Sequence, residues 1–340
     1  MAVYEFAPKK KVDNHIWICP GDTFVNEHGD WVRIECDDDC DSPRCDYNLG
    51  TFYTWLNSYA SPDEAPEEVE DLFGEFGLED EWEHACCEVD RRNEPIIAEY
   101  QKKLKAYKDE CANVRHRIET DKIVNAVRRK YADETGTEYH YKSSFDWFDG
   151  DPYAFPVEPK RPVLKGYPNP LMWFVCRLNE LGHVALPVSA YIHSGVVYKV
   201  GTPSQFPDSQ WDAGYAGLIY VTREKVLKEY MVDELTDDLR KRINRYLADE
   251  VEYFSEWAEG HTYGYVMTDH ETLEEDSCWG FIGDDAATNG MTDYTGDLQD
   301  TSLDYDEWLE KAEQRCEEMK EESDFENMHG QTAAYENYAA

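Results

Sequence analysis

The most regular hydrophobic pattern in the chain lies between residues 95 and 131. Apolar side chains recur there at alternating intervals of three and four residues, at Ile97, Tyr100, Leu104, Tyr107, Cys111, Val114 and Ile118. This heptad spacing is typical of a helix that packs along one partner. Residues 96–131 also carry ten Lys or Arg against five Asp or Glu. The pattern predicts a long, basic helix that forms one arm of a helical hairpin or coiled coil, or that covers a sheet.

Short apolar runs bounded by turn residues predict the strands of a sheet. They fall at residues 16–18, 31–34, 184–192, 196–200, 216–221, 263–267 and 278–282. Runs with helical spacing predict amphipathic helices. These fall at residues 72–82, 171–176, 223–226, 236–260 and 304–322. The expected fold class is therefore α+β, with a mixed or antiparallel sheet core, amphipathic helices and a long helical insertion.

The order of these patterns divides the chain into five parts. A β-rich beginning of the core (1–56) precedes an insertion that is first acidic and then heptad-helical (57–133). A connection rich in Pro, Gly and aromatic residues (134–170) leads to the main α+β core (171–283), and an acidic helix and tail follow (284–340). An apolar fraction of 41% can fill a core in a chain of 340 residues. The acidic composition therefore does not indicate a disordered chain.

Charge changes the functional expectations more than any motif does. The sequence has 73 Asp or Glu against 33 Lys or Arg, which gives a formal net charge of -40. Such a charge repels phosphate groups, so it argues against nonspecific binding to nucleic acid or to an anionic membrane surface. It favours cationic partners, and in particular proteins that normally bind DNA. The expected partner is a host protein, such as a nuclease or a defence complex, with no direct contact to nucleic acid or membrane.

The density of this charge tests whether the surface can imitate DNA. A compact protein of this mass exposes roughly 14,000 Å². The net charge then averages about one unit per 360 Å², against about one per 110 Å² on B-DNA, so a mimic needs its carboxylates gathered on one face. Residues 61–90 hold thirteen Asp or Glu and no Lys or Arg, and residues 284–340 hold seventeen against three. The candidate interaction residues are Asp63, Glu64, Glu67, Glu68, Glu70, Asp71, Glu75, Glu79, Asp80, Glu81, Glu310, Glu313, Glu317, Glu318, Glu321 and Glu322.

Three observations bear on the cellular compartment. Residues 1–6 have no apolar run behind positive charges, so we expect no signal peptide. No run approaches eighteen apolar residues, so we expect no membrane span. Ten Cys at irregular spacing in a chain of this length are typical of reduced thiols rather than of a disulfide framework. The expected localisation is cytoplasmic, in the host cell if a phage encodes the protein.

Several blocks of the sequence resemble a protein family common in bacteriophages, plasmids and mobile elements of gut bacteria. The blocks are Arg33-Ile-Glu35, Asp41-Ser-Pro-Arg44, Asn48-Leu-Gly-Thr51, Leu186-Pro-Val188, His193-Ser-Gly195, Trp211-Asp-Ala-Gly214, Gly217-Leu-Ile-Tyr-Val221, Glu250-Val-Glu-Tyr253, Gly260 with Tyr263-Gly264, and Asp276-Ser-Cys-Trp-Gly-Phe281. They lie within residues 31–56 and 171–283, somewhat under half of the chain. The resemblance implies an origin in a mobile element and no particular activity. It also lowers the expectation of a zinc site, because family members lack Cys at the positions of Cys36, Cys40 and Cys45.

Four residues in the recognised blocks form the candidate catalytic set: His193, Asp212, Asp276 and Cys278. Cys278 and His193 have the chemistry of a nucleophile and its base, and either aspartate can orient the imidazole. The alternatives are structural, with Cys278 as a buried thiol in a strand and Asp212 as a turn cap before Gly214. The sequence holds no G-x-x-x-x-G-K-[ST], G-x-S-x-G, H-E-x-x-H or G-x-G-x-x-G motif. Common nucleotide and hydrolase chemistry therefore has no sequence support.

Two groupings near residue 40 suggest metal sites, and each departs from the usual pattern. Four thiols could bind zinc but lack the compact C-x2-C pair of common zinc modules. They are Cys19, Cys36, Cys40 and Cys45. Asp37, Asp39 and Asp41 alternate as in an EF-hand loop, but Ser42 and Asn48 stand where that loop has Gly and Glu. A solvated acidic loop, with weak Ca²⁺ or Mg²⁺ binding as an alternative, is the simpler interpretation. We therefore predict no cofactor, with zinc as the alternative.

These observations leave three functional hypotheses. The first is a phage or mobile-element protein that binds host proteins, and most specifically an anti-CRISPR or anti-restriction inhibitor whose acidic surface blocks a nucleic-acid-binding site as a DNA mimic. The second is an enzyme that uses a His/Asp/Cys pocket in the 171–283 core. The third is a scaffold protein that self-associates, as a homodimer, through the 95–131 helix. We expect binding rather than catalysis.

Overall fold

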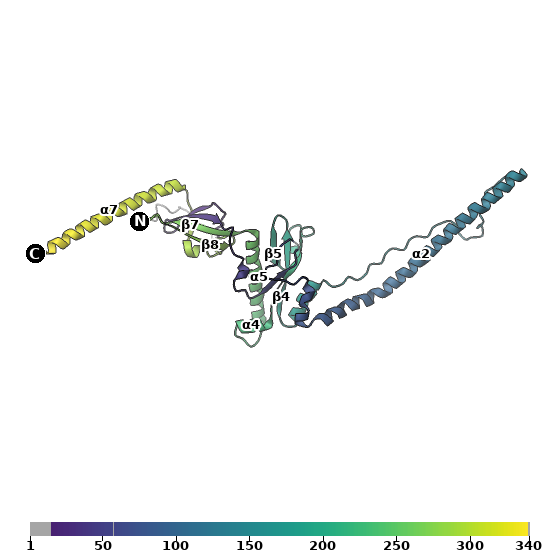
Figure 1. Cartoon of the computed structure of the whole chain (residues 1–340), viewed down its shortest axis with the longest axis horizontal. Coiled ribbons are helices and arrows are strands. Elements are labelled where there is room, and N and C mark those ends of the chain that lie inside the picture. The colour runs from purple at the N-terminus through teal and green to yellow at the C-terminus, as the bar shows by residue number, and fades with distance from the viewer. Residues whose placement is uncertain (1–14, 57, 339–340) are drawn as a thin grey trace. The chain divides into compact units, whose positions relative to one another are not determined.

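The computed structural model describes residues 15–56 and 58–338, with side chains as far as Glu321. The chain forms two compact units, one comprising Met1–Val69 and Leu171–Ala340 and the other Glu70–Pro170. Figure 1 shows the elements coloured by their order in the sequence. The fold is α+β with antiparallel sheets and one long helix, which confirms the predicted class. None of the described helices has an apolar stretch long enough to cross a lipid bilayer.

The first sheet of the larger unit has five strands in the order β8-β7-β2-β1-β9. Their bounds are β1 Thr23–Asn26, β2 Trp31–Cys36, β7 Thr262–Thr268, β8 Glu275–Ile282 and β9 Leu298–Asp300. Every neighbouring pair is antiparallel. Val32 and Ile34 are fully buried on β2, and they share one apolar core with Tyr265 of β7 and Phe281 of β8. The apolar run predicted as a strand at residues 31–34 thus forms β2, with Val32 and Ile34 on the face that enters this core.

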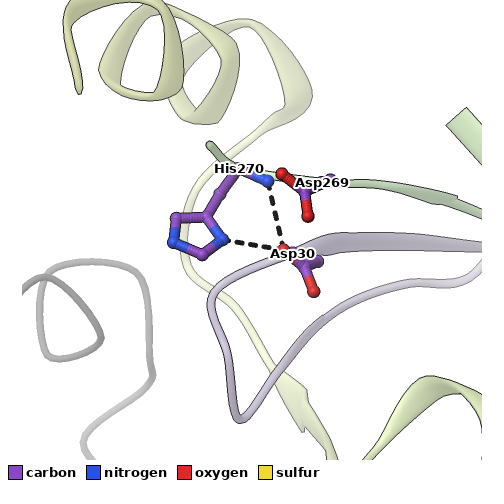
Figure 2. Close-up of side chains that lie close together, drawn as sticks. All are labelled: Asp30, Asp269 and His270. Carbon is purple, nitrogen blue, oxygen red and sulfur yellow. Dashed lines mark hydrogen bonds and ion pairs between the residues drawn. The ribbon is translucent and has the colours of Figure 1, made fainter. Parts of the chain in front are cut away.

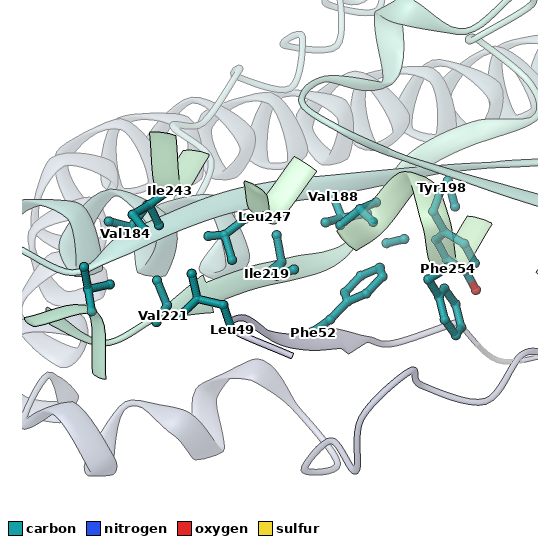
Figure 3. Close-up of a cluster of buried hydrophobic side chains, with 14 of the residues drawn as sticks. Leu49, Phe52, Val184, Val188, Tyr198, Ile219, Val221, Ile243, Leu247 and Phe254 are labelled. Carbon is teal, nitrogen blue, oxygen red and sulfur yellow. The ribbon is translucent and has the colours of Figure 1, made fainter. Parts of the chain in front are cut away.

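The second sheet has four strands in the order β3-β6-β4-β5, all antiparallel. Their bounds are β3 Thr51–Thr54, β4 Val184–Ile192, β5 Val196–Val200 and β6 Ala213–Val221. The helix α5 (Asp237–Glu259) begins at a cap in which Thr236 Oγ1 accepts from the backbone N–H of Leu239. Its apolar side chains recur every three or four residues and pack on the sheet with Phe52 and Ile219 (Figure 3). The helical residues in this core are Leu239, Ile243, Leu247, Val251 and Phe254.

The remaining helices of the larger unit are α3 (Pro170–Glu180), α4 (Arg223–Glu229), α6 (Thr292–Thr295) and α7 (Tyr305–Tyr338). On α7 the buried side chains are Trp308, Ala312 and Cys316, at the spacing predicted for residues 304–322. Trp308 and Ala312 pack with Val25 and Trp31 of the first sheet, and Cys316 Sγ donates to the Glu271 carbonyl oxygen. Short 3₁₀ turns occur at Pro43–Cys45 and Pro203–Gln205. The acidic terminal helix is therefore attached to the core along one stripe.

The smaller unit is built on one helix, α2 (Glu79–Thr135), which includes the predicted 95–131 segment. Residues 137–170 return along this helix without forming a second one (Figure 1). The backbone N–H of Ser144 donates to Asp121, and the Tyr141 hydroxyl donates to the same carboxylate. Nearer the beginning of α2, the side-chain amide of Asn93 donates to the Lys165 carbonyl oxygen and accepts from the Lys165 backbone N–H. The expected arm of a helical hairpin is therefore a helix paired with an extended return segment.

Two local predictions are wrong. Residues 72–82 do not form one amphipathic helix, because two 3₁₀ turns at Val69–Leu72 and Gly74–Phe76 precede α2. The second turn ends at Gly77, whose φ of 66° breaks a right-handed helix. The strand expected at residues 16–18 is reduced to a single bridge between Trp17 and Asp285. In both places the apolar spacing correctly marks buried residues but not the backbone conformation.

Candidate functional site

A cavity of about 340 Å³ opens beside the turn between β4 and β5. His193 lies at this turn, where its backbone N–H donates to the carbonyl oxygen of Gly195. The side chains of Glu259, the last residue of α5, and His261, which precedes β7, also line the cavity. The cavity is therefore lined by two histidines and a glutamate that come from two segments of the larger unit, the β4–β5 turn and the end of α5.

The end of α5 gives His261 its position. Gly260 takes φ of 84°, and the chain then turns back so that the backbone N–H of His261 donates to the Glu256 carbonyl oxygen over 3.0 Å. The imidazole Nδ1 lies 2.5 Å from Glu256 Oε2 and 3.5 Å from Asp284 Oδ1. The Tyr263 hydroxyl donates to the same Asp284 oxygen over 2.6 Å. One imidazole is thus held between two carboxylates at the negative end of a helix.

Burial and charge shift the pKa values of this group. Burial lowers the pKa of His261, but the hydrogen bond to Glu256 and the negative charge of Asp284 outweigh it and raise the pKa. Burial raises the pKa of the Glu259 carboxyl, and a hydrogen bond from Ser255 opposes that rise. Both side chains therefore keep their protons to a higher pH in the folded protein than they would in water.

The raised pKa of His261 predicts how stability depends on pH. The folded state favours the protonated imidazole, so its contribution to the free energy of unfolding is complete below the ordinary pKa of 6.5 and is lost as pH rises through the higher folded value. We expect the wild-type protein to lose more stability across this window than His261→Gln. Denaturation midpoints measured on both sides of the window check this, with exposed His28→Gln as the control. Parallel profiles for wild type and His261→Gln would contradict the expectation.

His193 and Asp212 are the two candidate catalytic residues that the structure brings together. The Nδ1 atom of His193 lies 3.5 Å from Asp212 Oδ2, and the imidazole stacks on Tyr191. The Asp212 carbonyl oxygen accepts from the backbone N–H of Ile192 over 2.9 Å, which fixes the aspartate beside the hairpin. Trp211 exposes 86% of its surface and lines a second cavity of about 270 Å³ together with Asp212. A solvent-accessible imidazole–carboxylate pair can act as a general base.

Asp276 and Cys278, the other two candidates, lie on β8 of the first sheet. Cys278 is opposite Tyr265 and Asp276 is opposite Met267 in the β7–β8 ladder. Cys278 is half-buried against the apolar core of that sheet. Within the described residues, no hydrogen bond or ion pair joins it to His193. This position agrees with the alternative interpretation of Cys278, a structural thiol in a strand.

The loop around residue 40 is held by hydrogen bonds of its own. Asp37 Oδ2 accepts from the backbone N–H of Gly280 over 2.9 Å and fastens the loop to β8. Cys36 Sγ donates to Asp38 over 3.2 Å, which raises the pKa of Cys36, and burial raises the pKa of Cys40. Two groups of side chains in the described part of the chain are close enough to hold an ion, and neither includes a thiol. All four candidate zinc ligands therefore lie outside both groups: Cys19, Cys36, Cys40 and Cys45.

One of these two groups consists of Asp30, Asp269 and His270. Asp30 Oδ1 accepts from both the backbone N–H and Nδ1 of His270, over 3.1 and 2.7 Å (Figure 2). The other Asp30 oxygen accepts from the Asn26 amide over 2.9 Å. Asp269 accepts from the backbone N–H of Thr272 over 2.7 Å. Because the carboxylates already serve these bonds, the group joins the β1–β2 turn to the β7–β8 turn as a structural contact.

The predicted interaction carboxylates are divided between α7 and the 61–90 segment. On α7 the described members are all exposed: Glu310, Glu313, Glu317, Glu318 and Glu321. The side chain of Glu322 lies outside those that the structure describes. In the other segment Asp63 is used inside the fold, because both of its oxygens accept from the guanidinium of Arg44. Glu70 is half-buried. The remaining members are exposed: Glu64, Glu67, Glu68, Asp71, Glu75, Glu79, Asp80 and Glu81.

Sequence reasoning missed the group of Glu256, His261 and Asp284. Glu256 and His261 are five residues apart across the end of a helix, a spacing that predicts no shared face until Gly260 reverses the chain. The available signal was the recognised block from Gly260 to Gly264, which includes His261. Comparisons with models of protein families, with curated proteins and with solved structures found no match to this chain.

Proposed function

We propose that this protein acts by binding another protein through the exposed carboxylates of α7. The observation that supports this is their density. Between Asp306 and Glu321 the helix carries seven exposed carboxylates and three basic residues over about 22 Å. One carboxylate per roughly 3 Å resembles the spacing of phosphates along one DNA strand, about 3.4 Å. Subtracting the basic residues leaves about one net charge per 6 Å.

Averaged over the whole surface, the acidic charge is more dilute. The accessible surface is 22904 Å², so the net charge of -40 averages about one unit per 570 Å², against about one per 110 Å² on B-DNA. The area exceeds the roughly 14,000 Å² of a compact protein, because helices such as the 57-residue α2 are exposed along most of their length. Recognition by charge therefore depends on a local cluster, and α7 presents one on a helix that is anchored to a sheet core.

The partner class follows from the chemistry of the surface. Lys and Arg side chains that normally contact phosphates are the groups that a row of carboxylates attracts. The proposed partner is thus a nucleic-acid-binding host protein such as a nuclease or defence complex. The resemblance to a mobile-element family supports the specific form of the proposal, an anti-defence inhibitor that occupies a nucleic-acid-binding site. In that role the protein acts in the cytoplasm of the host cell.

Neutralising α7 tests the proposal. We expect Glu310, Glu313 and Glu317, changed together to Gln, to abolish capture of nucleic-acid-binding proteins from host lysate at low salt, because most of the net charge of the described α7 side chains is removed. In the wild type, capture should fall steeply as salt rises, and added duplex DNA should displace the captured protein. The matched control changes three exposed carboxylates outside both clusters: Asp233, Glu234 and Glu274. Equal capture by both triple variants, or capture that duplex DNA cannot displace, would contradict the proposal.

A second function is favoured by one observation, the 3.5 Å approach of His193 to Asp212 beside two cavities. In this alternative the pair acts as a general base on a ligand in the cavity. His193→Gln and Asp212→Asn should then remove the biological effect, measured as establishment of a phage or plasmid in a host with a nuclease defence, while capture by α7 stays intact. A normal effect from both variants would exclude the pair from the function.

A further inference from the structure

The group of Glu256, His261 and Asp284 differs from the other ligand-rich group in its exposure to solvent. In both groups the ligand atoms lie within 4.8 Å of one another and already take part in hydrogen bonds. Asp30 and His270 are buried, however, whereas Glu256, His261 and Asp284 are all half-buried. The imidazole also lines a cavity of about 340 Å³, which leaves room for water on one side. A small ligand could therefore reach the group from solvent.

Three features favour a cation at this position. The carboxylates of Glu256 and Asp284 supply two negative charges around one imidazole nitrogen. The last carbonyl groups of α5 add the negative end of a helix dipole. Glu259, at the end of the same helix, lines the adjoining cavity. In the described part of the chain, no Lys or Arg forms an ion pair with these three carboxylates.

The second sphere of the group is already arranged as metal sites require. The Tyr263 hydroxyl donates to Asp284 Oδ1 over 2.6 Å and fixes the direction of that carboxylate. The Gly260 turn and the His261 backbone bond to Glu256 O fix the imidazole from the other side. Such partners orient ligands before an ion binds, and their loss usually weakens metal affinity. The ligand positions are therefore set by the fold.

We propose that His261 Nδ1 and the carboxylates of Glu256 and Asp284 bind one divalent first-row transition-metal ion, such as Zn²⁺, Co²⁺ or Mn²⁺. Imidazole combined with carboxylate ligands suits this class of ion. Binding replaces the proton that Nδ1 shares with Glu256 Oε2, and the released proton goes to solvent. Water from the cavity completes the coordination. The site is independent of the acidic face of α7, so it adds to the proposed function rather than depending on it.

Titration of the full-length, chelator-treated protein with Co²⁺ tests the site. We expect saturable binding of one equivalent, with visible absorption typical of nitrogen and oxygen ligands, and displacement by Zn²⁺. His261→Gln should weaken this binding by about tenfold or more, since even the loss of an orienting partner costs that much. Asp284→Asn should weaken it as well. The matched control is His28→Gln, an exposed imidazole 3.6 Å from Glu27, which should bind like the wild type.

Each alternative has a distinct result. Weak, unsaturable binding that His261→Gln leaves unchanged would mean that Co²⁺ only coats the acidic surface, and would overturn the proposal. A thiolate-to-cobalt charge-transfer band would place the ion on cysteines and overturn it too. Thermal unfolding gives a second readout: Zn²⁺ should raise the midpoint of the wild type and of His28→Gln but not that of His261→Gln. Circular dichroism of each variant without metal shows whether it is folded.

Discussion

Replacing Arg44 by Met is expected to destabilise the larger unit by about 3–5 kcal/mol, the usual cost of removing one partner from a buried ion pair. The Arg44 side chain is only 5% exposed. Its Nη1 donates to Glu250 over 3.0 Å, while Nε and Nη2 donate to the two oxygens of Asp63 over 3.0 and 2.6 Å. Nη2 also donates to the Gly50 carbonyl oxygen over 2.8 Å. No other group in this network supplies positive charge to the two carboxylates.

The loss of stability should exceed that expected for one salt bridge, because Glu250 and Asp63 also accept hydrogen bonds from backbone N–H groups. Glu250 accepts from the backbone N–H groups of Leu49 and Gly50, and Asp63 accepts from that of Phe52. Without the guanidinium, two carboxylates remain together in a site of low polarity. The measurement is the shift in chemical-denaturation midpoint.

Arg33→Met is the matched control for this measurement. Arg33 forms a surface pair with Glu35, and its side chain is 55% exposed. Exposed pairs of this kind contribute at most about 1 kcal/mol. Equal shifts for the two arginine variants would show that the Arg44 network adds nothing beyond a surface pair.

The Arg44 network also explains part of the recognised sequence blocks. Arg44, Leu49, Gly50 and Glu250 come from three separate blocks, and the fold joins them in one contact. Gly217 of another block lies where β3 and β6 approach closely, since a Cβ there would be 1.9 Å from the Tyr53 carbonyl oxygen. Several of the resembling residues are therefore explained by folding alone. Other block residues, among them His193, Asp212 and His261, line a cavity instead.

The spacing of apolar residues predicted the elements whose buried face packs against a single hydrophobic core. The stripe of α5 was readable because its apolar side chains all pack on one core. The same reasoning failed at residues 72–82, where buried Leu72, Phe73 and Leu78 sit on turns that Gly77 interrupts. It also could not identify the partner of the α2 seam, because residues 137–170 carry no periodic signal of their own.

The candidate site was partly predictable for a related reason. His193 and Asp212 were expected near strand ends, and antiparallel pairing of β4 with β6 brings those ends together. Cys278 was assigned to the same pocket because its thiol has the chemistry of a nucleophile and it lies in a recognised block. A sequence, however, does not show how two separate sheets are placed relative to each other. His261 and Asp284 lie at the two ends of the β7–β8 hairpin. Their contact could be predicted only if the register of that hairpin were known.

Replacing Trp308 by Ala is expected to release α7 from the first sheet. Trp308 is fully buried, packs 5.8 Å from the ring of Trp31, and donates from Nε1 to the Gly29 carbonyl oxygen over 3.0 Å. Its loss leaves a large cavity and an unpaired carbonyl group, at a cost of about 3–5 kcal/mol. Amide hydrogen exchange should show protection lost first along α7, while β2 and β7 stay protected. Trp211→Ala, at a side chain that is 86% exposed, is the matched control and should leave exchange unchanged.

The same variant separates organised recognition from bulk charge. Trp308→Ala keeps every carboxylate of α7 but removes the anchor that holds the helix on the sheet. If partners recognise a fixed row of carboxylates, capture at low salt should weaken by about tenfold or more, because ordering a released segment costs a few kcal/mol at the moment of binding. If Trp308→Ala captures the same proteins as the wild type with the same salt dependence, net charge alone is sufficient, and the DNA-mimic form of the proposal fails although the helix still binds. The comparison with the Glu310, Glu313 and Glu317 variant then shows whether position or number of carboxylates sets the affinity.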